Sequence, residues 1–105
     1  MKTIITSTGN TDQSAFDARF GRAEYYCIYD DTEKRHEFIR NEFSMDKRSS
    51  GKNAAIWASR NRVKRIISGD FGPRAKDILD QAGIQMVILP DRDLTIHDII
   101  AKISK

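Results

Sequence analysis

The chain alternates between short apolar runs rich in β-branched residues and segments in which apolar residues recur with the spacing of a helix. The apolar runs end at turn residues, such as Gly9 after the first run and Pro90 after the last. These patterns predict five strands, over residues 2–7, 24–30, 35–41, 64–68 and 84–89. They also predict three helices, over residues 53–58, 73–82 and 96–103.

The helix at 73–82 has the clearest signals of the three. Pro73 suits a first helical turn, where a missing N–H costs nothing, and Gly83 is a helix stop signal. Between them, one apolar face is formed by Ala75, Ile78, Leu79 and Ala82. Hydroxyl residues that can cap a helix precede the other two helices, Ser49 and Ser50 before the first and Thr95 before the last.

The order of these elements predicts an α/β fold. The strands at 24–30 and 35–41 are separated only by a short charged turn, which favours a hairpin. A helix separates each later pair of strands, which favours parallel pairing through right-handed crossovers. We therefore predict a mixed five-stranded sheet, with its second strand antiparallel, flanked by three helices in a single domain over residues 1–105.

Composition limits the class of protein further. A chain of 105 residues is one small domain that can form its own core. It has one cysteine, so no internal disulfide can form, and no Cys/His cluster has the spacing of a zinc module. The apolar run in residues 1–7 is too short for a signal peptide or a membrane span. We expect a cytoplasmic protein without a membrane partner.

The net charge of +3 conceals an uneven distribution of charge along the chain. Residues 47–76 contain nine lysines and arginines but only one acid, Asp70. Such a segment suits an anionic partner, and nucleic acid is one alternative. Its cations are spread over a helix, a strand and loops, with only Trp57 and Phe71 as aromatic residues among them, so we expect nucleic-acid binding to be the weaker interpretation.

A ligand site is expected where the parallel strands end. In open α/β sheets, ligands bind beyond the carboxyl ends of the strands. The segments 8–22, 42–50 and 69–72 follow three strands that we expect to run in the same direction. Two of them lead into helix N-termini, whose free amides favour an anion, and Arg19, Arg22, Lys52 and Arg74 add positive charge.

Several residues have two interpretations at this level. Cys27 lies within a predicted strand, either as a small buried apolar residue or as a reactive or metal-binding thiol. Phe20 and Gly21 are either the rim of a site or a bulge with an aromatic plug. His36 and His97 are isolated, without a second imidazole at ligand spacing, and we expect both at the surface.

A set of short motifs resembles the dinitrogenase iron-molybdenum cofactor biosynthesis family, which comprises NifX-like small proteins and the C-terminal domain of NifB-like proteins. In chain order the motifs are Asp17-x-Arg19-Phe20-Gly21-Arg22-Ala23, Asn41, Ser50-Gly51-Lys52, Ile66-Ile67-Ser68-Gly69-x-x-Gly72-Pro73-x-Ala75 and Leu79-x-x-Ala82-Gly83-Ile84. The resemblance implies a ribonuclease H-like fold and a protein that binds or carries an iron-sulfur or iron-molybdenum cluster without catalysis. One position departs from the family, because Arg19 stands where members commonly have a histidine. A charged arginine cannot ligate a metal but can pair with an anionic cluster.

These observations together predict a non-enzymatic carrier that holds an anionic cluster, or another anionic ligand, at the carboxyl edge of the sheet. The candidate ligand-binding residues are Asn10, Arg19, Phe20, Gly21, Gly51, Lys52, Asn53, Gly69 and Gly72, with Cys27 as an auxiliary metal candidate. The ribonuclease H-like label invites a nuclease, but the first strand contains no acid to bridge two metal ions, and no Ser/His/Asp or Cys/His arrangement replaces it. Expected partners are a cluster donor or acceptor protein, with the chain itself a monomer or weak dimer.

Overall fold

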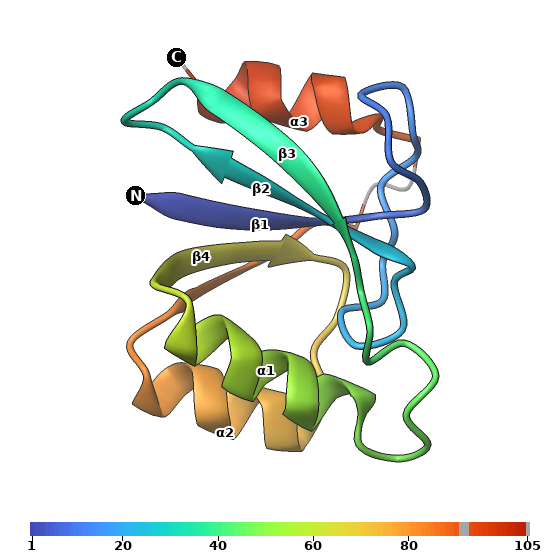
Figure 1. Ribbon diagram of the computed structural model, residues 1–105, viewed down its shortest axis with the longest axis vertical. Coiled ribbons are helices and arrows are strands. Elements are labelled where there is room, and N and C mark those ends of the chain that lie inside the picture. Colours follow the sequence, from blue (N-terminus) through green and yellow to red (C-terminus); the bar gives the residue numbers. More distant parts are fainter. Residues whose placement is uncertain (91–92, 105) are drawn as a thin grey trace.

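A computed structural model of the protein describes residues 1–90 and 93–104. Its elements are β1 (Lys2–Ser7), β2 (Tyr25–Asp30), β3 (Arg35–Arg40), α1 (Ser50–Arg60), β4 (Val63–Ser68), α2 (Pro73–Gln81), β5 (Gln85–Ile88) and α3 (Ile96–Ile103). The strands form one sheet in the order β3-β2-β1-β4-β5 (Figure 1). The predicted α/β fold is confirmed. Only α1 is much longer than predicted, because its two ends are polar and carry no apolar repeat.

The sheet is mixed, as the sequence predicted. The central strand β1 pairs antiparallel with β2 and parallel with β4, so that Ile5 lies between Cys27 and Ile67. β3 pairs antiparallel with β2, and β5 pairs parallel with β4. β2 therefore runs against all the other strands. The C-terminal ends of β1, β3, β4 and β5 lie together, and this side of the sheet is called the carboxyl edge below.

Helices cover both faces of the sheet, with α1 and α2 on one face and α3 on the other (Figure 1). Side chains alternate along β1, so Ile4 and Ile5 enter different layers, and both are fully buried. The α1/α2 layer contains Ile4, Phe20, Ala23, Tyr26, Ala54, Ala55, Ala58, Val63, Ile66, Ala75, Leu79 and Ile84. The smaller α3 layer contains Ile5, Phe16, Cys27, Ile67, Ile96 and Ile99.

The helix ends follow the sequence signals with one exception. α3 begins with a capping box, in which the Thr95 hydroxyl accepts a hydrogen bond from the Asp98 amide (3.1 Å) and the Asp98 carboxylate accepts one from the Thr95 amide (3.0 Å). Pro73 lies in the first turn of α2, as predicted. The predicted hydroxyl cap of α1 is not formed, since its N-cap residue Ser49 makes no side-chain hydrogen bond.

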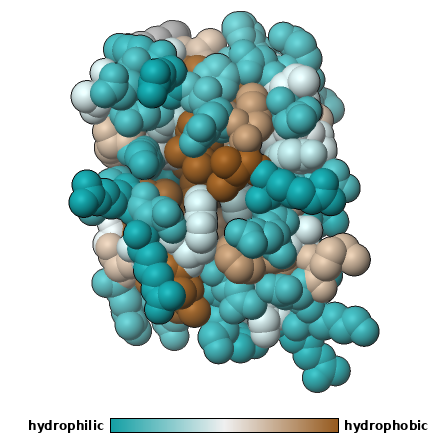
Figure 2. Space-filling view, viewed as in Figure 1, coloured by the Kyte–Doolittle hydropathy of each residue, from teal (hydrophilic) through white to brown (hydrophobic). Residues whose placement is uncertain are grey.

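The α1/α2 layer leaves part of its face of the sheet open beside β2 and β3. Ile28 and Ile39 of these strands are only partly buried, as is Trp57 of α1. The space-filling view shows the side of the molecule that has β3 and α1 in front, with hydrophobic side chains near its middle and mostly hydrophilic ones around them (Figure 2). Among the described residues, no helix is long and apolar enough to cross a membrane.

Candidate functional site

The connections after β1, β3 and β4 meet at the carboxyl edge, as the sequence predicted (Figure 1). The connection after β1 has two parts. Its first part is joined to the start of α3, because the amides of His97 and Ile96 donate to the carbonyls of Asp12 (2.9 Å) and Ser14 (3.0 Å). Its second part, residues 17–24, lies on the α1/α2 side of the sheet and is called the edge loop below.

Buried polar groups at the ends of β1 and β4 fix the start of the edge loop. The Thr6 hydroxyl, which is fully buried, donates to the Asp17 carbonyl. The next carbonyl, of Ala18, accepts hydrogen bonds from the amides of Gly69 and Asp70, both at 2.9 Å. The loop after β1 and the loop after β4 are therefore held together by backbone hydrogen bonds.

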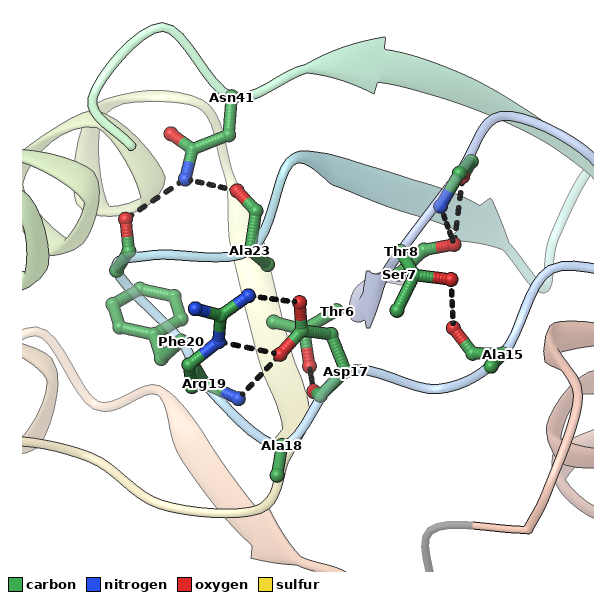
Figure 3. A network of polar contacts seen from close by, with 12 residues as sticks. Thr6, Ser7, Thr8, Ala15, Asp17, Ala18, Arg19, Phe20, Ala23 and Asn41 are labelled. Carbon is green, nitrogen blue, oxygen red and sulfur yellow. Dashed lines mark hydrogen bonds and ion pairs between the residues drawn. The ribbon is translucent and has the colours of Figure 1, made fainter. Parts of the chain in front are cut away.

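Asn41, the residue after β3, holds the other end of the edge loop. Its side-chain amide donates to the carbonyls of Gly21 (3.0 Å) and Ala23 (2.8 Å), as Figure 3 shows. Its side-chain oxygen accepts the amide of Phe43 at 3.0 Å, and the residue is only 2% exposed. Asn41 was not among the predicted site residues, although it belongs to the motif set that carried the family resemblance.

The edge loop also lies directly against the first turn of α1. A Cβ atom added to Gly21 would lie 2.7 Å from the Cα atom of Gly51 and 2.8 Å from the carbonyl carbon of Ser50. Two backbones can approach this closely only because Gly21 has no side chain. The edge loop thus contacts segments that follow β3 and β4, and the predicted grouping of Arg19, Gly21, Gly51 and Gly69 at one edge is observed.

Arg19 makes a bidentate ion pair with Asp17 (Figure 3). Its Nε atom donates to Asp17 Oδ1 and its Nη2 atom to Oδ2, both at 3.1 Å, while its backbone amide donates to Oδ1 at 2.9 Å. The carboxylate is 6% exposed and the guanidinium side chain 61% exposed. The hydrogen bonds that Arg19 donates to Asp17, together with the negative charge of that carboxylate, raise the pKa of Arg19, so the arginine is permanently charged.

The Phe20 ring is an aromatic plug and does not line the surface of the site. It is 2% exposed, and its centroid lies 5.9 Å from that of Tyr26 and 5.3 Å from that of Phe71. The Tyr26 hydroxyl donates to the Phe20 carbonyl at 2.7 Å. Burial, with a smaller effect from Asp17, raises the pKa of Tyr26, so this hydroxyl keeps its proton. Of the two interpretations of Phe20, the structure supports the plug.

Comparison with known proteins identifies the family. The family model described as dinitrogenase iron-molybdenum cofactor matches residues 1–105. The chain belongs to this family. No curated protein matches the chain.

Solved structures with the same fold superpose on the chain. The apo form of the orange protein from Desulfovibrio gigas superposes with a TM-score of 0.86 at 24% sequence identity, over 96% of this chain and 84% of that chain. A putative NifB protein from Thermotoga superposes with a TM-score of 0.81 at 26% identity, over 98% of this chain and 86% of that chain. The first likeness, below 25% identity, concerns the fold alone.

The other predicted site residues of this family member are placed as follows. Lys52 is exposed in the first turn of α1, and Gly72 is the exposed N-cap residue of α2. The Asn53 side chain donates to Asp46 (2.9 Å), and the Gly69 amide is occupied by Ala18 as described above. Asn10 is exposed in the part of the first connection that adjoins α3, away from the edge loop.

The thiol of Cys27 and the imidazole of His36 lie away from the edge loop. Cys27 is fully buried in the α3 layer, and burial, with a smaller effect from Asp12, raises its pKa to about 12. His36 was expected to be isolated, but its Nε2 atom lies 2.6 Å from Asp12 Oδ1. Within residues 1–90 and 93–104, no group of three His, Cys, Asp or Glu side chains could hold a metal ion.

The basic segment 47–76 does not form one patch in the structure. Arg48 and Lys52 lie at the N-terminal end of α1, at the carboxyl edge, whereas Arg60 and Arg62 lie at its C-terminal end. A helix of 11 residues is about 16 Å long, so α1 separates the two groups of cations by roughly that distance. The concentration of charge in the sequence is thus divided between opposite edges of the sheet.

Proposed function

We propose that this protein is a non-enzymatic carrier that binds an anionic iron-sulfur or iron-molybdenum cluster at the carboxyl edge. The observation that carries the proposal is the construction of the edge loop. The carbonyls of Asp17, Ala18, Phe20, Gly21 and Ala23 all accept hydrogen bonds from the protein itself. Because these carbonyl oxygens point into the protein, the backbone groups that the loop leaves for a ligand are N–H donors. Backbone N–H donors attract an anion.

The donors available at this edge are backbone amides and cations. The amide of Gly21 makes no hydrogen bond with the described residues, nor do those of Gly51 and Lys52 in the first turn of α1. The positive end of the α1 dipole is at the same place. The exposed side chains of Lys52 and Arg74 lie along one groove between α1 and α2 and add full charge.

The donor set also indicates how such a cluster would be held. Iron and molybdenum in clusters are ligated by thiolate, sulfide or imidazole. Apart from the exposed carboxylate of Glu24 at its end, the edge loop offers amides and guanidinium groups, which bind the outside of an anion and cannot enter a metal's coordination sphere. We therefore infer that the cargo arrives with its coordination complete and is bound through its anionic shell, with no bond from metal to protein.

Anaerobic gel filtration tests this proposal with a synthetic thiolate-ligated iron-sulfur cluster dianion as the probe. We expect its visible absorbance to elute with the protein, whereas free Fe²⁺ alone is not retained. The variant Lys52→Ala/Arg74→Ala should weaken retention about tenfold, since it removes two charges from the edge.

The matched control is Arg60→Ala/Lys64→Ala, which removes the same charge from the opposite edge of the sheet, at the C-terminal end of α1 and the start of β4. It should retain the cluster as well as the unaltered protein does. Absence of co-elution, or equal weakening in both double variants, would contradict a site at the carboxyl edge. Retention of free Fe²⁺ would contradict binding through a complete anionic shell.

Further properties belong to this proposal. The ribonuclease H-like classification follows from the family resemblance and stays a prediction, as does the single domain over residues 1–105. A carrier role requires a protein that donates the cluster and one that accepts it, which we place in the cytoplasm. Absence of magnesium-dependent cleavage of an RNA–DNA hybrid is the expected result for a protein without catalysis.

A further inference from the structure

Asp17 is the buried carboxylate of the edge loop, and it lies beneath Arg19. Both backbone groups of Asp17 are bonded to Thr6, because its amide donates to the Thr6 carbonyl (3.0 Å) and its carbonyl accepts from the Thr6 hydroxyl. With a side chain only 6% exposed, Asp17 has little freedom to move. The Asp17 carboxylate therefore holds the Arg19 guanidinium in a fixed position.

The remaining guanidinium nitrogen of Arg19 is left for another partner. Nε and Nη2 are both engaged by Asp17, whereas Nη1 has no hydrogen-bond partner among the described residues and points away from the carboxylate in Figure 3. Arginine has a rigid planar fork, so fixing two nitrogens also fixes the direction of the third. The unengaged edge of Arg19 therefore has a defined direction before any ligand binds.

The ion pair affects the affinity for an anion in two opposite ways. The negative charge of Asp17 cancels the positive charge of Arg19, which weakens long-range attraction. The same carboxylate orders the guanidinium, which removes the entropy cost of ordering it when a ligand binds. Which consequence is larger decides whether Asp17 opposes binding or assists it.

We propose that Asp17 is a positioning residue, which orients Arg19 as a directional donor toward the anionic ligand while Lys52 and Arg74 supply the net charge. This inference rests on the proposed function, because it concerns the same site. It assigns a role to Asp17, which the sequence analysis included only as part of a motif. It also assigns to Arg19 the role of a directional donor and leaves attraction at long range to the exposed lysine and arginine.

The direction in which one substitution changes the affinity for the cluster tests the inference. Asp17→Asn keeps an oxygen for the Arg19 amide but removes the negative charge. If Asp17 acted only through its charge, this variant would bind the synthetic iron-sulfur cluster dianion more tightly than the unaltered protein. A positioning role predicts the reverse, a loss of about tenfold in affinity, which is typical of one charge-assisted hydrogen bond.

Two further variants complete the measurement, which uses anaerobic equilibrium dialysis. Arg19→Lys keeps the charge but has no fork, so it should lose about tenfold, and combining it with Asp17→Asn should add little more. The control Asp77→Asn removes a carboxylate from the groove that contains Lys52 and Arg74 and leaves Arg19 untouched. This control should bind the cluster at least as tightly as the unaltered protein.

Each outcome has a definite meaning. If the unaltered protein binds no cluster, the proposed function and this inference both fail. If it binds and Asp17→Asn binds equally or more tightly, the inference alone is overturned. If Asp17→Asn does not fold, as judged by circular dichroism, Arg19→Lys decides the matter because its side chain is largely exposed, and unchanged affinity in that variant overturns the inference.

Discussion

Asn41 shows how one small polar side chain can determine the shape of a site without contacting a ligand. Its three hydrogen bonds join the end of β3 to the edge loop and to the next connection. A buried amide that serves two carbonyls and one N–H cannot be replaced by an apolar residue without leaving these groups unpaired.

We expect Asn41→Ala to lower the free energy of unfolding by about 2 to 3 kcal/mol, because buried carbonyls of the edge loop lose their donor. Urea denaturation followed by the fluorescence of Trp57, the only tryptophan in the chain, measures this loss. The matched control is Asn61→Ala, whose side chain donates to the Trp57 carbonyl at the exposed end of α1. It should cost about 0.5 kcal/mol or less, and equal losses in the two variants would contradict the role given to Asn41.

The burial of Cys27 leads to a prediction about how the stability of the protein depends on pH. Its pKa is raised from 9.0 to about 12 in the folded protein. The folded state therefore holds its proton more tightly than the unfolded state, and this stabilising contribution is complete below pH 9 and is lost as pH rises from 9 toward 12. At pH 10 the thiol should lower the free energy of unfolding by about 1.4 kcal/mol relative to pH 8.

The comparison protein for this measurement is Cys27→Ala. It lacks the thiol and should be less stable at pH 8 because of the lost packing, but it should lose less stability than the unaltered protein between pH 8 and pH 10. Groups other than Cys27 titrate alike in both proteins, so the difference between the two losses isolates the thiol. Identical losses would show that Cys27 is not buried as described.

At the scale of elements, the position of the edge loop depends on its contact with α1. Gly21→Ala places a methyl group against the backbone of Gly51, which cannot move without displacing the first turn of the helix. We expect a loss of about 2 kcal/mol or more in the free energy of unfolding, from overpacking against a fixed backbone. Urea denaturation is again the measurement.

Gly72→Ala is the matched control for this contact. Gly72 also begins a helix at the carboxyl edge, but a Cβ atom there meets nothing within 4 Å, and its φ of −65° suits any residue. Its substitution should change stability by less than about 0.5 kcal/mol. If Gly72→Ala were as costly as Gly21→Ala, loss of glycine flexibility would explain both effects, and the contact with α1 would not.

The elements were predictable because their signals are local. Strand β1 is a β-branched run followed by a turn, and α2 begins with Pro73 and is followed by Gly83, which has the left-handed φ of 72° that a glycine adopts readily. The direction of β2 followed from the short hairpin turn, and the parallel pairing of β4 and β5 followed from α2 between them. None of these inferences requires knowledge of a distant contact.

The site was predictable only as a region, since its details are contacts between residues far apart in the sequence. The sequence grouped Arg19, Gly21 and Gly51 at one edge because strand direction alone places their loops there. It could not show that Asn41 reaches back 20 residues to Gly21. It also could not show that Phe20 turns inward, because an aromatic residue before a glycine fits a rim and a plug equally well.

For the molecule as a whole, the division of the basic segment leads to a prediction about nucleic acid. Affinity for a polyanion depends on how many phosphates are contacted together. The cations at the two ends of α1 are separated by about 16 Å along the helix axis, and Trp57 is partly buried against the core. Its ring stacks on Tyr26 with centroids 6.3 Å apart, so only part of the ring is open to stack on a base.

We therefore expect fluorescence anisotropy of labelled single-stranded and duplex oligonucleotides to stay flat at about 50 mM salt, where non-specific electrostatic binding is strong. The same titration at about 200 mM salt provides the comparison. Saturable binding at low salt that falls steeply at high salt would contradict this expectation. The double variants Lys52→Ala/Arg74→Ala and Arg60→Ala/Lys64→Ala would then locate the bound nucleic acid. Loss of affinity in both variants would mean that one polyanion follows α1 from end to end. Loss of affinity in the first variant alone would place the nucleic acid at the edge proposed for the cluster.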